Sequence, residues 1–187
     1  MSLKRCNWVS DDPVYIDYHD EEWGVPVHNE QRLFEFLILE TFQAGLSWIT
    51  ILRKRENFRL ALEDFDYKKV ALYDKDKVAS LLENTGIIRN KLKVKSAISN
   101  AHAFMEVQME FGSFDKYIWG FVNGKPLQND FSSMRDVPPK TELAELLSKD
   151  LKKRGFKFVG PTVIYAYMQA TGMVNDHTID CFRHKEV

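Results

Sequence analysis

Apolar residues recur at intervals of three and four positions along most of the chain from residue 30 onward, the period of helices with one buried face. No segment shows sustained alternation of apolar and polar residues, so the pattern predicts an all-α fold. The expected helices span residues 30–42, 47–62, 67–73, 75–83, 91–111, 114–122, 141–154 and 162–171. Residues 1–29 lack a helical period and are expected to be irregular or to form short turns. Residues 123–139, rich in proline, form the longest expected loop.

The most apolar of these helices carries an acid. The segment from Leu33 to Trp48 reads LFEFLILETFQAGLSW, and Glu40 continues the apolar stripe that Leu33 begins. Most other positions of this helix are also apolar, so it should be buried nearly all round. A buried carboxylate is costly unless it is paired. Two interpretations stay open: Glu40 meets a basic side chain or caps a neighbouring helix, or it faces a pocket and binds a polar or cationic ligand.

A helix break is expected directly after this acid. Gln43-Ala44-Gly45 should end the helix, Ser47 has the character of an N-cap, and Trp48 begins the next helix. One helix-loop-helix would therefore bring a carboxylate, a glycine loop and an indole together.

Four large aromatic residues crowd the N-terminal segment: Trp8, Tyr15, Tyr18 and Trp23. Packing in the core is the default explanation for each ring. The alternative is that the rings line a slot for a flat ligand.

Composition limits the classes of protein. With 187 residues, 44% of them hydrophobic and 13% aromatic, the chain is long enough for one domain with a substantial core. It has no apolar run of about 18 residues and no apolar signal-peptide core, so no membrane span and a cytoplasmic location are expected. The formal net charge of −1 excludes a general basic field. Nucleic-acid binding would therefore depend on local basic patches.

Two such basic patches are present. One is Arg89-Asn90-Lys91, with Lys93 and Lys95 behind it, and the other is Lys149–Gly160, KDLKKRGFKFVG. In the second patch a helix ends in a tight turn and a new helix begins, and backbone N–H groups at a helix start bind phosphate. A solvated helix face followed by an ordinary turn explains the same charges without a ligand.

A possible metal site joins the two ends of the chain. His177 and Cys181 have i, i+4 spacing, which lets both bind one ion, and Cys6 and His19 would complete a Cys₂His₂ set. Zinc suits these donors, and four protein ligands would make the single ion structural. The alternative is two free thiols and two unrelated histidines. Spacing alone does not exclude three competing histidines: His28, His102 and His184.

These features together resemble one family. The chain is similar to the constitutive bacterial DNA-3-methyladenine glycosylases (3-methyladenine DNA glycosylase I), which belong to the helix-hairpin-helix glycosylase superfamily. The stretches that carry the resemblance run from Arg5 to Cys181: RCNWVSDDPVYIDYHDEEWGVP, LETFQAGLSWITILRKRENFR, GIIRNKLKVKSAISNA, SKDLKKRGFKFVGPTVIYAYMQATGMVNDH and HTIDC.

The resemblance implies a fold and a metal. A two-lobed, mainly helical domain over residues 1–187 is expected, with a cleft between a lobe built from both termini and a central helical lobe over about 45–160. The central lobe would carry the hairpin. The family's zinc-ligand pattern falls on four residues: Cys6, His19, His177 and Cys181.

The resemblance also implies a base pocket and a DNA-binding surface. The pocket maps onto Glu40, Tyr18 and Trp48, with Trp8 and Tyr15 beside them. The loop that enters the DNA helix corresponds to Ala44-Gly45-Leu46, and the hairpin to Gly155–Gly160. The residues expected to contact DNA are Gly45, Leu46, Arg89, Lys157 and Gly160.

The expected mechanism follows from the charge of the lesion. 3-Methyladenine is cationic while it is attached to deoxyribose, so it leaves readily and the enzyme mainly has to extract and hold it. Trp48 and Tyr18 can stack on a flat cation, and an ionised Glu40 can accept hydrogen bonds from the adenine amino group. A neutral, undamaged base would gain less from both.

Two positions bear on the type of glycosylase. Bifunctional relatives carry a nucleophilic lysine two residues after the last hairpin glycine, where this chain has Thr162. Excision without strand cleavage is therefore expected. Asp176 lies roughly where many superfamily members carry an aspartate that supports the sugar cation, but it also adjoins His177 and can orient that histidine instead.

The expected partners are double-stranded alkylated DNA and the free base, and a monomer is expected. Other functions stay open at this point. They are excision of another alkylated purine such as 3-methylguanine or 7-methylguanine, binding of damaged DNA without turnover, and a zinc-stapled helical interaction module with Glu40 in a buried ion pair.

Overall fold

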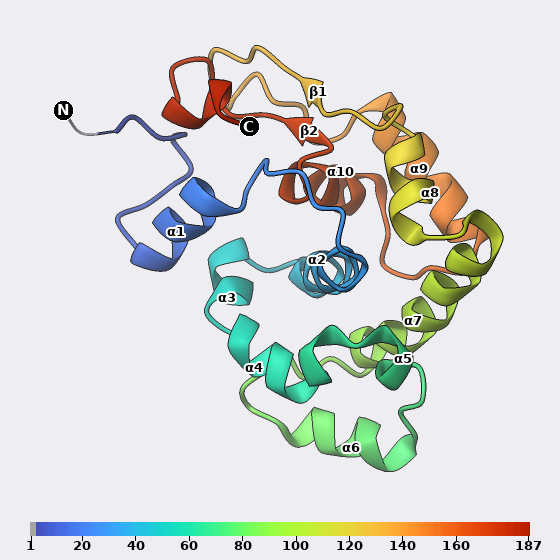
Figure 1. Ribbon diagram of the computed structural model, residues 1–187. Helices are drawn as coiled ribbons and strands as arrows, with labels where there is room; N and C mark the ends of the chain where they lie inside the picture. The colour runs from blue at the N-terminus through green and yellow to red at the C-terminus, as the bar shows by residue number, and fades with distance from the viewer. Residues whose placement is uncertain (1–2) are drawn as a thin grey trace.

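The structure is a computed structural model that describes residues 3–187, and it is mostly helical, as predicted (Figure 1). The α-helices are α1 (Pro13–Glu21), α2 (Glu30–Gln43), α3 (Trp48–Leu52), α4 (Arg55–Ala61), α5 (Tyr67–Val70), α6 (Lys75–Glu83), α7 (Lys91–Phe111), α8 (Phe114–Gly120), α9 (Glu142–Lys153) and α10 (Pro161–Ala170). Single 3₁₀ turns occur at η1 (Glu63–Phe65) and η2 (Phe182–Lys185). None of the helices among residues 3–187 combines the length and apolar character needed to cross a bilayer.

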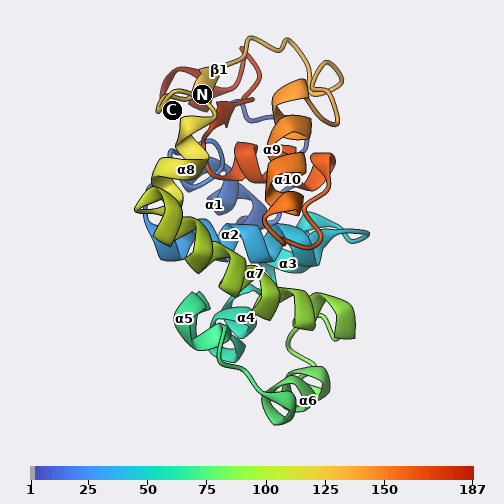
Figure 2. The same cartoon turned by 90° about the vertical axis from the view of Figure 1, so that its right-hand side faces the viewer.

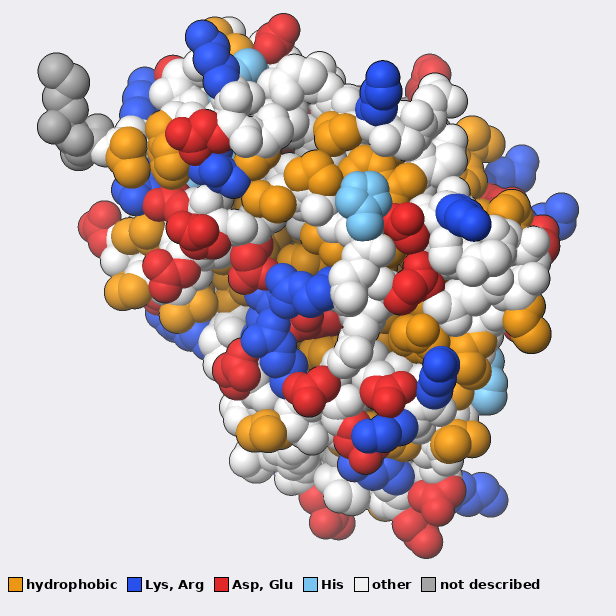
Figure 3. All heavy atoms as spheres, viewed as in Figure 1, with side chains coloured by type: hydrophobic (Ala, Val, Ile, Leu, Met, Phe, Trp, Pro, Cys, Tyr) orange, Lys and Arg blue, Asp and Glu red, His pale blue; other side chains and the backbone are white. Residues whose placement is uncertain are grey.

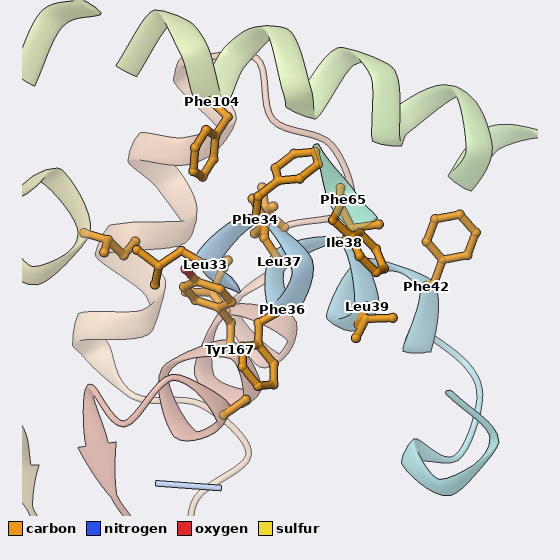
Figure 4. Close-up of a cluster of buried hydrophobic side chains, with 14 of the residues drawn as sticks. Leu33, Phe34, Phe36, Leu37, Ile38, Leu39, Phe42, Phe65, Phe104 and Tyr167 are labelled. Carbon is orange, nitrogen blue, oxygen red and sulfur yellow. The ribbon is translucent and has the colours of Figure 1, made fainter. Parts of the chain in front are cut away.

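Helix α2 lies in the middle of the molecule, with the other helices around it (Figure 1). Every residue from Leu33 to Phe42 is buried, and the apolar side chains project to all sides of the helix (Figure 4). Phe34, for example, meets Phe104 of α7 with ring centroids 5.3 Å apart. The sequence prediction of a helix without a free face is therefore confirmed.

The N-terminal segment differs from the prediction because it contains α1. Asp12 and Pro13 begin this helix. The Asp12 side chain accepts a hydrogen bond from the Val14 N–H, and Pro13 takes the first helical position, where its missing N–H costs nothing. The helix has little amphipathic period, which is why the apolar pattern did not reveal it. It places Tyr18 and His19 in the interior.

The predicted helix over residues 47–62 is two short helices, α3 and α4, separated at Arg53 and Lys54. Ser47 has the extended backbone of an N-cap, but its hydroxyl bonds the Thr50 hydroxyl (2.7 Å) instead of a backbone N–H. The break lets Arg55 turn toward Glu35, which its guanidinium reaches at 2.8 Å. That ion pair is a tertiary contact, so local propensity did not predict the break.

The longest helix, α7, has the predicted bounds because both ends carry strong local signals. The Asn90 side chain caps its first turn, and Gly112 ends it with φ of +85°, a conformation that favours glycine. Its buried face includes Ala97 and Phe104, whereas the apolar residues Ile98 and Met105 are only half-buried.

Two segments far apart in the sequence form a small parallel sheet, a departure from the predicted all-α fold. Strand β1 (Leu127–Gln128) lies in the long loop before α9, and it pairs with β2 (Val174–Asn175) after α10. Between α10 and β2, Gly172 has φ of +69°, and a Cβ here would lie 2.4 Å from the Val25 carbonyl carbon. This close approach holds the segment after α1 against the end of α10. The predicted division into two lobes stays a prediction.

Candidate active site and metal centre

A cavity of about 240 Å³ opens beside the C-terminal half of α2. All five residues that the resemblance assigned to the base pocket line it: Trp8, Tyr15, Tyr18, Glu40 and Trp48. They come from several segments, because Tyr15 and Tyr18 lie on α1, Glu40 on α2 and Trp48 at the start of α3. The structure therefore brings the predicted pocket residues together.

Further lining residues were not found by the sequence prediction: Trp23, Gln43, Met134, Ala166 and Gln169. Gln43 had a detectable signal, since it lies three positions after Glu40 and so shares its helix face. Trp23 was one of the clustered aromatics for which core packing and a ligand slot both stayed open, but the resemblance did not assign it to the pocket. Met134 and Gln169 carried no local signal, because only the tertiary fold brings the long loop and α10 to this cavity.

The rings of the cavity meet edge to face or tilted, which leaves ring faces available. Trp8 meets Tyr15 edge-on at 5.2 Å, and Tyr18 lies tilted by 56° against Trp48 at 5.4 Å. The indole N–H groups of Trp8 and Trp48 are buried and have no hydrogen-bond partner in the described structure. Such unpaired donors are uncommon inside proteins, and these two belong to residues that line the cavity, where a ligand could accept from them.

Glu40 is the unpaired charge-bearing group of the cavity. The residue is only 3% exposed, and its Oε2 atom has no partner among residues 3–187. Burial raises the pKa of Glu40 to about 8. Burial, and then the nearby Glu40 carboxylate, also hold the pKa of Tyr18 well above its usual range, so the phenol keeps its proton.

Glu35, a second buried acid on the same helix, differs from Glu40 because it is paired with basic side chains. Burial alone would raise the pKa of Glu35, but the hydrogen bond and charge of Arg55 lower it overall. Arg32 also contacts this carboxylate, at 2.8 Å. The ion-pair interpretation that was open for Glu40 is therefore wrong for Glu40 and describes Glu35 instead.

The predicted metal ligands also come together. The ligand atoms of Cys6, His19, His177 and Cys181 all lie within 4.8 Å of one another, and the four residues are buried. Cys181 Sγ lies 3.4 Å from both His19 Nε2 and His177 Nδ1. Two soft sulfurs and two imidazole nitrogens that converge in this way fit a transition-metal ion. The group joins the N-terminal segment to the residues after β2.

The outer nitrogen of each imidazole is held so that the inner one can bind an ion. His19 Nδ1 lies 2.7 Å from Asp20 Oδ1, and the same carboxylate accepts hydrogen bonds from Arg5. His177 Nε2 donates to the Trp23 carbonyl oxygen at 2.9 Å. These contacts set the tautomer that metal-binding histidines need. The competing histidines, His28, His102 and His184, are not part of the group.

The loop between α2 and α3 projects from the protein beside the cavity. Gly45 has φ of +83° with open space around it, and Leu46 is 39% exposed. Lys93 of α7 supports this loop, donating to the Phe42 carbonyl (2.8 Å) and the Ala44 carbonyl (2.6 Å). Lys93 was grouped with the basic patch in the sequence, but it is buried and serves as an internal cap of α2.

The turn between α9 and α10 is fixed to α7. Asn100 accepts a hydrogen bond from the Lys157 N–H (2.8 Å) and donates to the Lys157 carbonyl (3.1 Å). Gly160 then precedes α10 with φ of −63°, and a Cβ added there would meet nothing within 4 Å, so neither backbone nor packing requires glycine. Its small size instead leaves the start of α10 open to close approach.

The turn, the projecting loop and the start of α7 lie on one side of the molecule (Figure 2). Arg89, Lys91, Lys95 and Lys157 belong to this side, and no carboxylate lies within 4.0 Å of their charged groups in the described part of the chain. The side facing the viewer in Figure 1 differs, because acidic and basic side chains alternate there (Figure 3). The unpaired cations are suited to phosphate.

Residues 8–184 match the family described as Methyladenine glycosylase. The chain belongs to this family. It is 47% identical over 179 residues to DNA-3-methyladenine glycosylase 1 of Escherichia coli K12, a match that covers 96% of both chains. It is 48% identical over 177 residues to the DNA-3-methyladenine glycosylase of Haemophilus influenzae, covering 95% of this chain and 96% of the relative. A crystal structure of 3-methyladenine DNA glycosylase I, 49% identical, superposes with a TM-score of 0.93 and covers 96% of this chain and 98% of that one.

Membership of the methyladenine glycosylase family confirms the function predicted from the sequence. The chain is an enzyme that removes 3-methyladenine from alkylated DNA. The non-catalytic alternatives are therefore set aside, and the cavity and the metal group can be interpreted as parts of a glycosylase.

Proposed function

We propose that this glycosylase turns 3-methyladenine out of duplex DNA into the ring-lined cavity and hydrolyses its glycosidic bond there. The unpaired carboxylate of Glu40 carries the proposal. It lies among aromatic rings with no cation beside it, and a positively charged purine would supply both the missing charge and hydrogen-bond donors. Trp48 and Tyr18 would contact the faces of the base, with Trp8 and Tyr15 completing the walls.

The chemistry needs little acid assistance. Water adds to C1′ of the deoxyribose, the bond between C1′ and the base nitrogen breaks, and its electron pair neutralises the cationic base. The proton of the attacking water passes to solvent. Glu40 therefore stabilises the bound cation and does not protonate a leaving group. The ring faces add cation–π attraction of roughly 0.5–2 kcal/mol per contact.

Selectivity follows from the same charge. A neutral purine gains less from the Glu40 carboxylate and from the ring faces than a methylated, cationic one does. Cations such as 3-methylguanine and 7-methylguanine share this advantage, so they remain the alternative substrates. The amino group of adenine distinguishes 3-methyladenine if it donates to Glu40.

We also propose that excision proceeds without strand cleavage. Strand cleavage by a glycosylase needs an amine nucleophile, and none of the described residues that line the cavity is a lysine. Thr162 occupies the position after the hairpin where bifunctional relatives carry their lysine, and it is exposed.

The metal group fits zinc. Tetrahedral zinc with bonds of about 2.3 Å to sulfur and 2.05 Å to nitrogen separates sulfur from nitrogen ligands by roughly 3.6 Å. The sulfur–nitrogen distances of 3.4 and 3.6 Å between Cys181 or Cys6 and His177 agree with this value. A bound zinc ion would be structural, because four protein ligands leave no coordination position for substrate. Cys6, His19, His177 and Cys181 would hold it.

The projecting loop and the turn would grip the DNA on either side of the lesion. Leu46 would fill the gap left by the extruded base, because it is apolar and exposed and lies in the chain between Gln43 and Trp48, which line the cavity. The turn Gly155–Gly160, the hairpin of the proposed helix-hairpin-helix, would meet the phosphate backbone through the N-terminus of α10. Arg89, Lys157 and Gly160 would add contacts to the same strand.

Release of free base tests the proposed function. The protein is incubated with methylated duplex DNA, and the bases that come off are identified by chromatography. We expect 3-methyladenine to be released ahead of any methylated guanine, with the DNA strand intact. Borohydride should trap no covalent protein–DNA adduct, because no amine attacks the sugar. Tight binding without base release would contradict the proposal, and a trapped adduct would contradict excision without strand cleavage.

Replacing Lys157 by alanine should weaken DNA binding without harming the cavity. One lost phosphate contact is expected to lower the slope of log affinity against log salt by about 0.9 and to reduce affinity about equally for all DNA sequences. Titration of an uncleavable duplex at several salt concentrations measures both effects. Lys125→Ala, at an exposed position next to β1, serves as the matched control. Equal salt slopes for the two variants would show that Lys157 does not contact the DNA phosphates.

A further inference from the structure

A buried carboxylate next to the metal group takes no part in the mechanism above. Asp176 is 1% exposed, and three neutral donors converge on it. Tyr165 and Gln169 donate to Oδ2 at 2.6 and 2.8 Å, and Asn129 donates to Oδ1 at 2.7 Å. Burial and the hydrogen bond to Asp176 raise the pKa of Tyr165, so this phenol stays a donor.

These contacts favour a positioning role for Asp176 over the catalytic role that was also open. The residue is not among those that line the cavity in the described structure, and its oxygens are already occupied by donors. It is almost completely buried, and each of its oxygens already accepts at least one hydrogen bond. Its effect on the reaction must therefore pass through a neighbour that reaches the cavity.

Gln169 is that neighbour. It lies on α10 and lines the cavity, and its backbone carbonyl is held by the Gly24 N–H at 3.0 Å. An amide side chain has one donor end and one acceptor end. Because the NH₂ group of Gln169 is turned to Asp176, its carbonyl oxygen Oε1 is the free end, and no residue in the described part of the chain donates to it.

We propose that Gln169 presents Oε1 to the flipped base as a second acceptor beside Glu40, and that Asp176 is a positioning residue that fixes this orientation. The proposal rests on the proposed function, since the ligand is the cationic purine of the same cavity. A carbonyl dipole whose negative end faces a cation stabilises it, whereas an inverted amide would turn two N–H groups toward the positive charge. The contacts of Asp176 thus determine the polarity of one cavity wall.

The first test replaces Gln169 by leucine, which keeps the approximate volume and removes the acceptor. We expect kcat/KM for release of 3-methyladenine from DNA to fall on the order of 10-fold, as for a lost hydrogen bond to a charged group. The melting temperature should stay close to that of the parent, because Gln169 is only half-buried. A folded Gln169→Leu protein with undiminished kcat/KM would overturn the proposal.

A double-mutant cycle tests whether Asp176 acts through Gln169. Asp176→Asn allows the Gln169 amide to invert, so we expect a loss similar to that of Gln169→Leu. Combining the two changes should add less than about 2-fold to either single loss. Losses that multiply would show that Asp176 acts independently of Gln169 and would overturn the positioning role.

Asn129→Ala is the matched control, because it removes a donor from the other oxygen of Asp176 without touching the cavity. It should leave kcat/KM within about 2-fold of the parent. If Asp176→Asn does not fold, the result for Gln169→Leu alone decides whether Gln169 presents an acceptor to the base. Base release by the parent protein is measured alongside. If the parent releases no base, the proposed function fails; if the parent is active and Gln169→Leu is equally active, only this inference fails.

Discussion

Replacing Glu40 by glutamine should lower kcat/KM for excision of 3-methyladenine on the order of 10- to 100-fold. The substitution keeps the shape of the side chain but removes the negative charge that, in the proposed complex, faces the cationic base. Affinity for free 3-methyladenine should fall as well, and single-turnover excision together with equilibrium binding of the free base measures both effects. Unchanged affinity for the free base would show that Glu40 does not contact it.

The same substitution should make the protein more stable at neutral and alkaline pH. The pKa of Glu40 is about 8 in the folded protein and 4.5 in its ordinary environment. Between these values the folded state keeps a proton that the unfolded state has lost, so the free energy of unfolding decreases as pH rises from 4.5 to 8. Glutamine does not titrate, so its advantage grows over this window, up to about 5 kcal/mol as an upper limit, and then levels off.

Glu35→Gln on the same helix is the matched control for that stability effect. Glu35 is paired with Arg55, so losing its charge leaves a buried guanidinium without its partner and should destabilise the protein. Thermal or urea unfolding from pH 5 to 9 compares the two variants. If Glu40→Gln lowered stability as Glu35→Gln does, the carboxylate of Glu40 would have a structural partner after all.

Removing the proposed zinc ion should cause the largest loss of stability. Chelation, or Cys181→Ala, is expected to destabilise the protein by several kcal/mol, because the group joins Cys6, and His19 of α1, to residues near the other end of the chain. Activity should fall too, since the ring of His19 packs against Trp8 of the cavity wall, with centroids 5.4 Å apart. Melting curves with and without chelator, together with metal analysis by mass spectrometry, measure these effects.

His102→Ala is the control for the metal experiment, because this exposed histidine lies outside the group. It should retain one zinc ion per chain and the melting temperature of the parent. A parent protein that contains no metal and melts at the same temperature in chelator would contradict a structural zinc site.

The fold could be predicted where local signals were strong. The bounds of α7 follow from Asn90 and Gly112, and the burial of α2 follows from its composition. The prediction of secondary structure failed where tertiary contacts determine the local conformation. The break at Arg53 and Lys54 comes directly before Arg55, which forms a tertiary ion pair with Glu35. The β1–β2 pairing joins segments that only the complete fold brings together.

The candidate site could also be predicted only in part, because several of its residues are brought together by tertiary contacts. Spacing suggested the pair of His177 and Cys181, with Cys6 and His19 as possible partners. Because these partners lie more than 150 residues away, spacing left competing histidines open, and only the family resemblance selected the four residues. Lys93 could not be separated from its basic neighbours, because the sequence does not show that its ammonium turns inward. Gln169 carried no signal, since its orientation depends on Asp176.

The position of α2 also has a mechanical consequence. Its last turns carry both Glu40 and the loop with Leu46, and the helix is enclosed by the core on every side. Tilting it would open that core, so in the proposed mechanism the residue that binds the lesion and the loop that enters the duplex form one rigid unit. Most of the distortion needed to bring a damaged nucleotide to the enzyme would then occur in the DNA, which favours sites where the double helix bends easily.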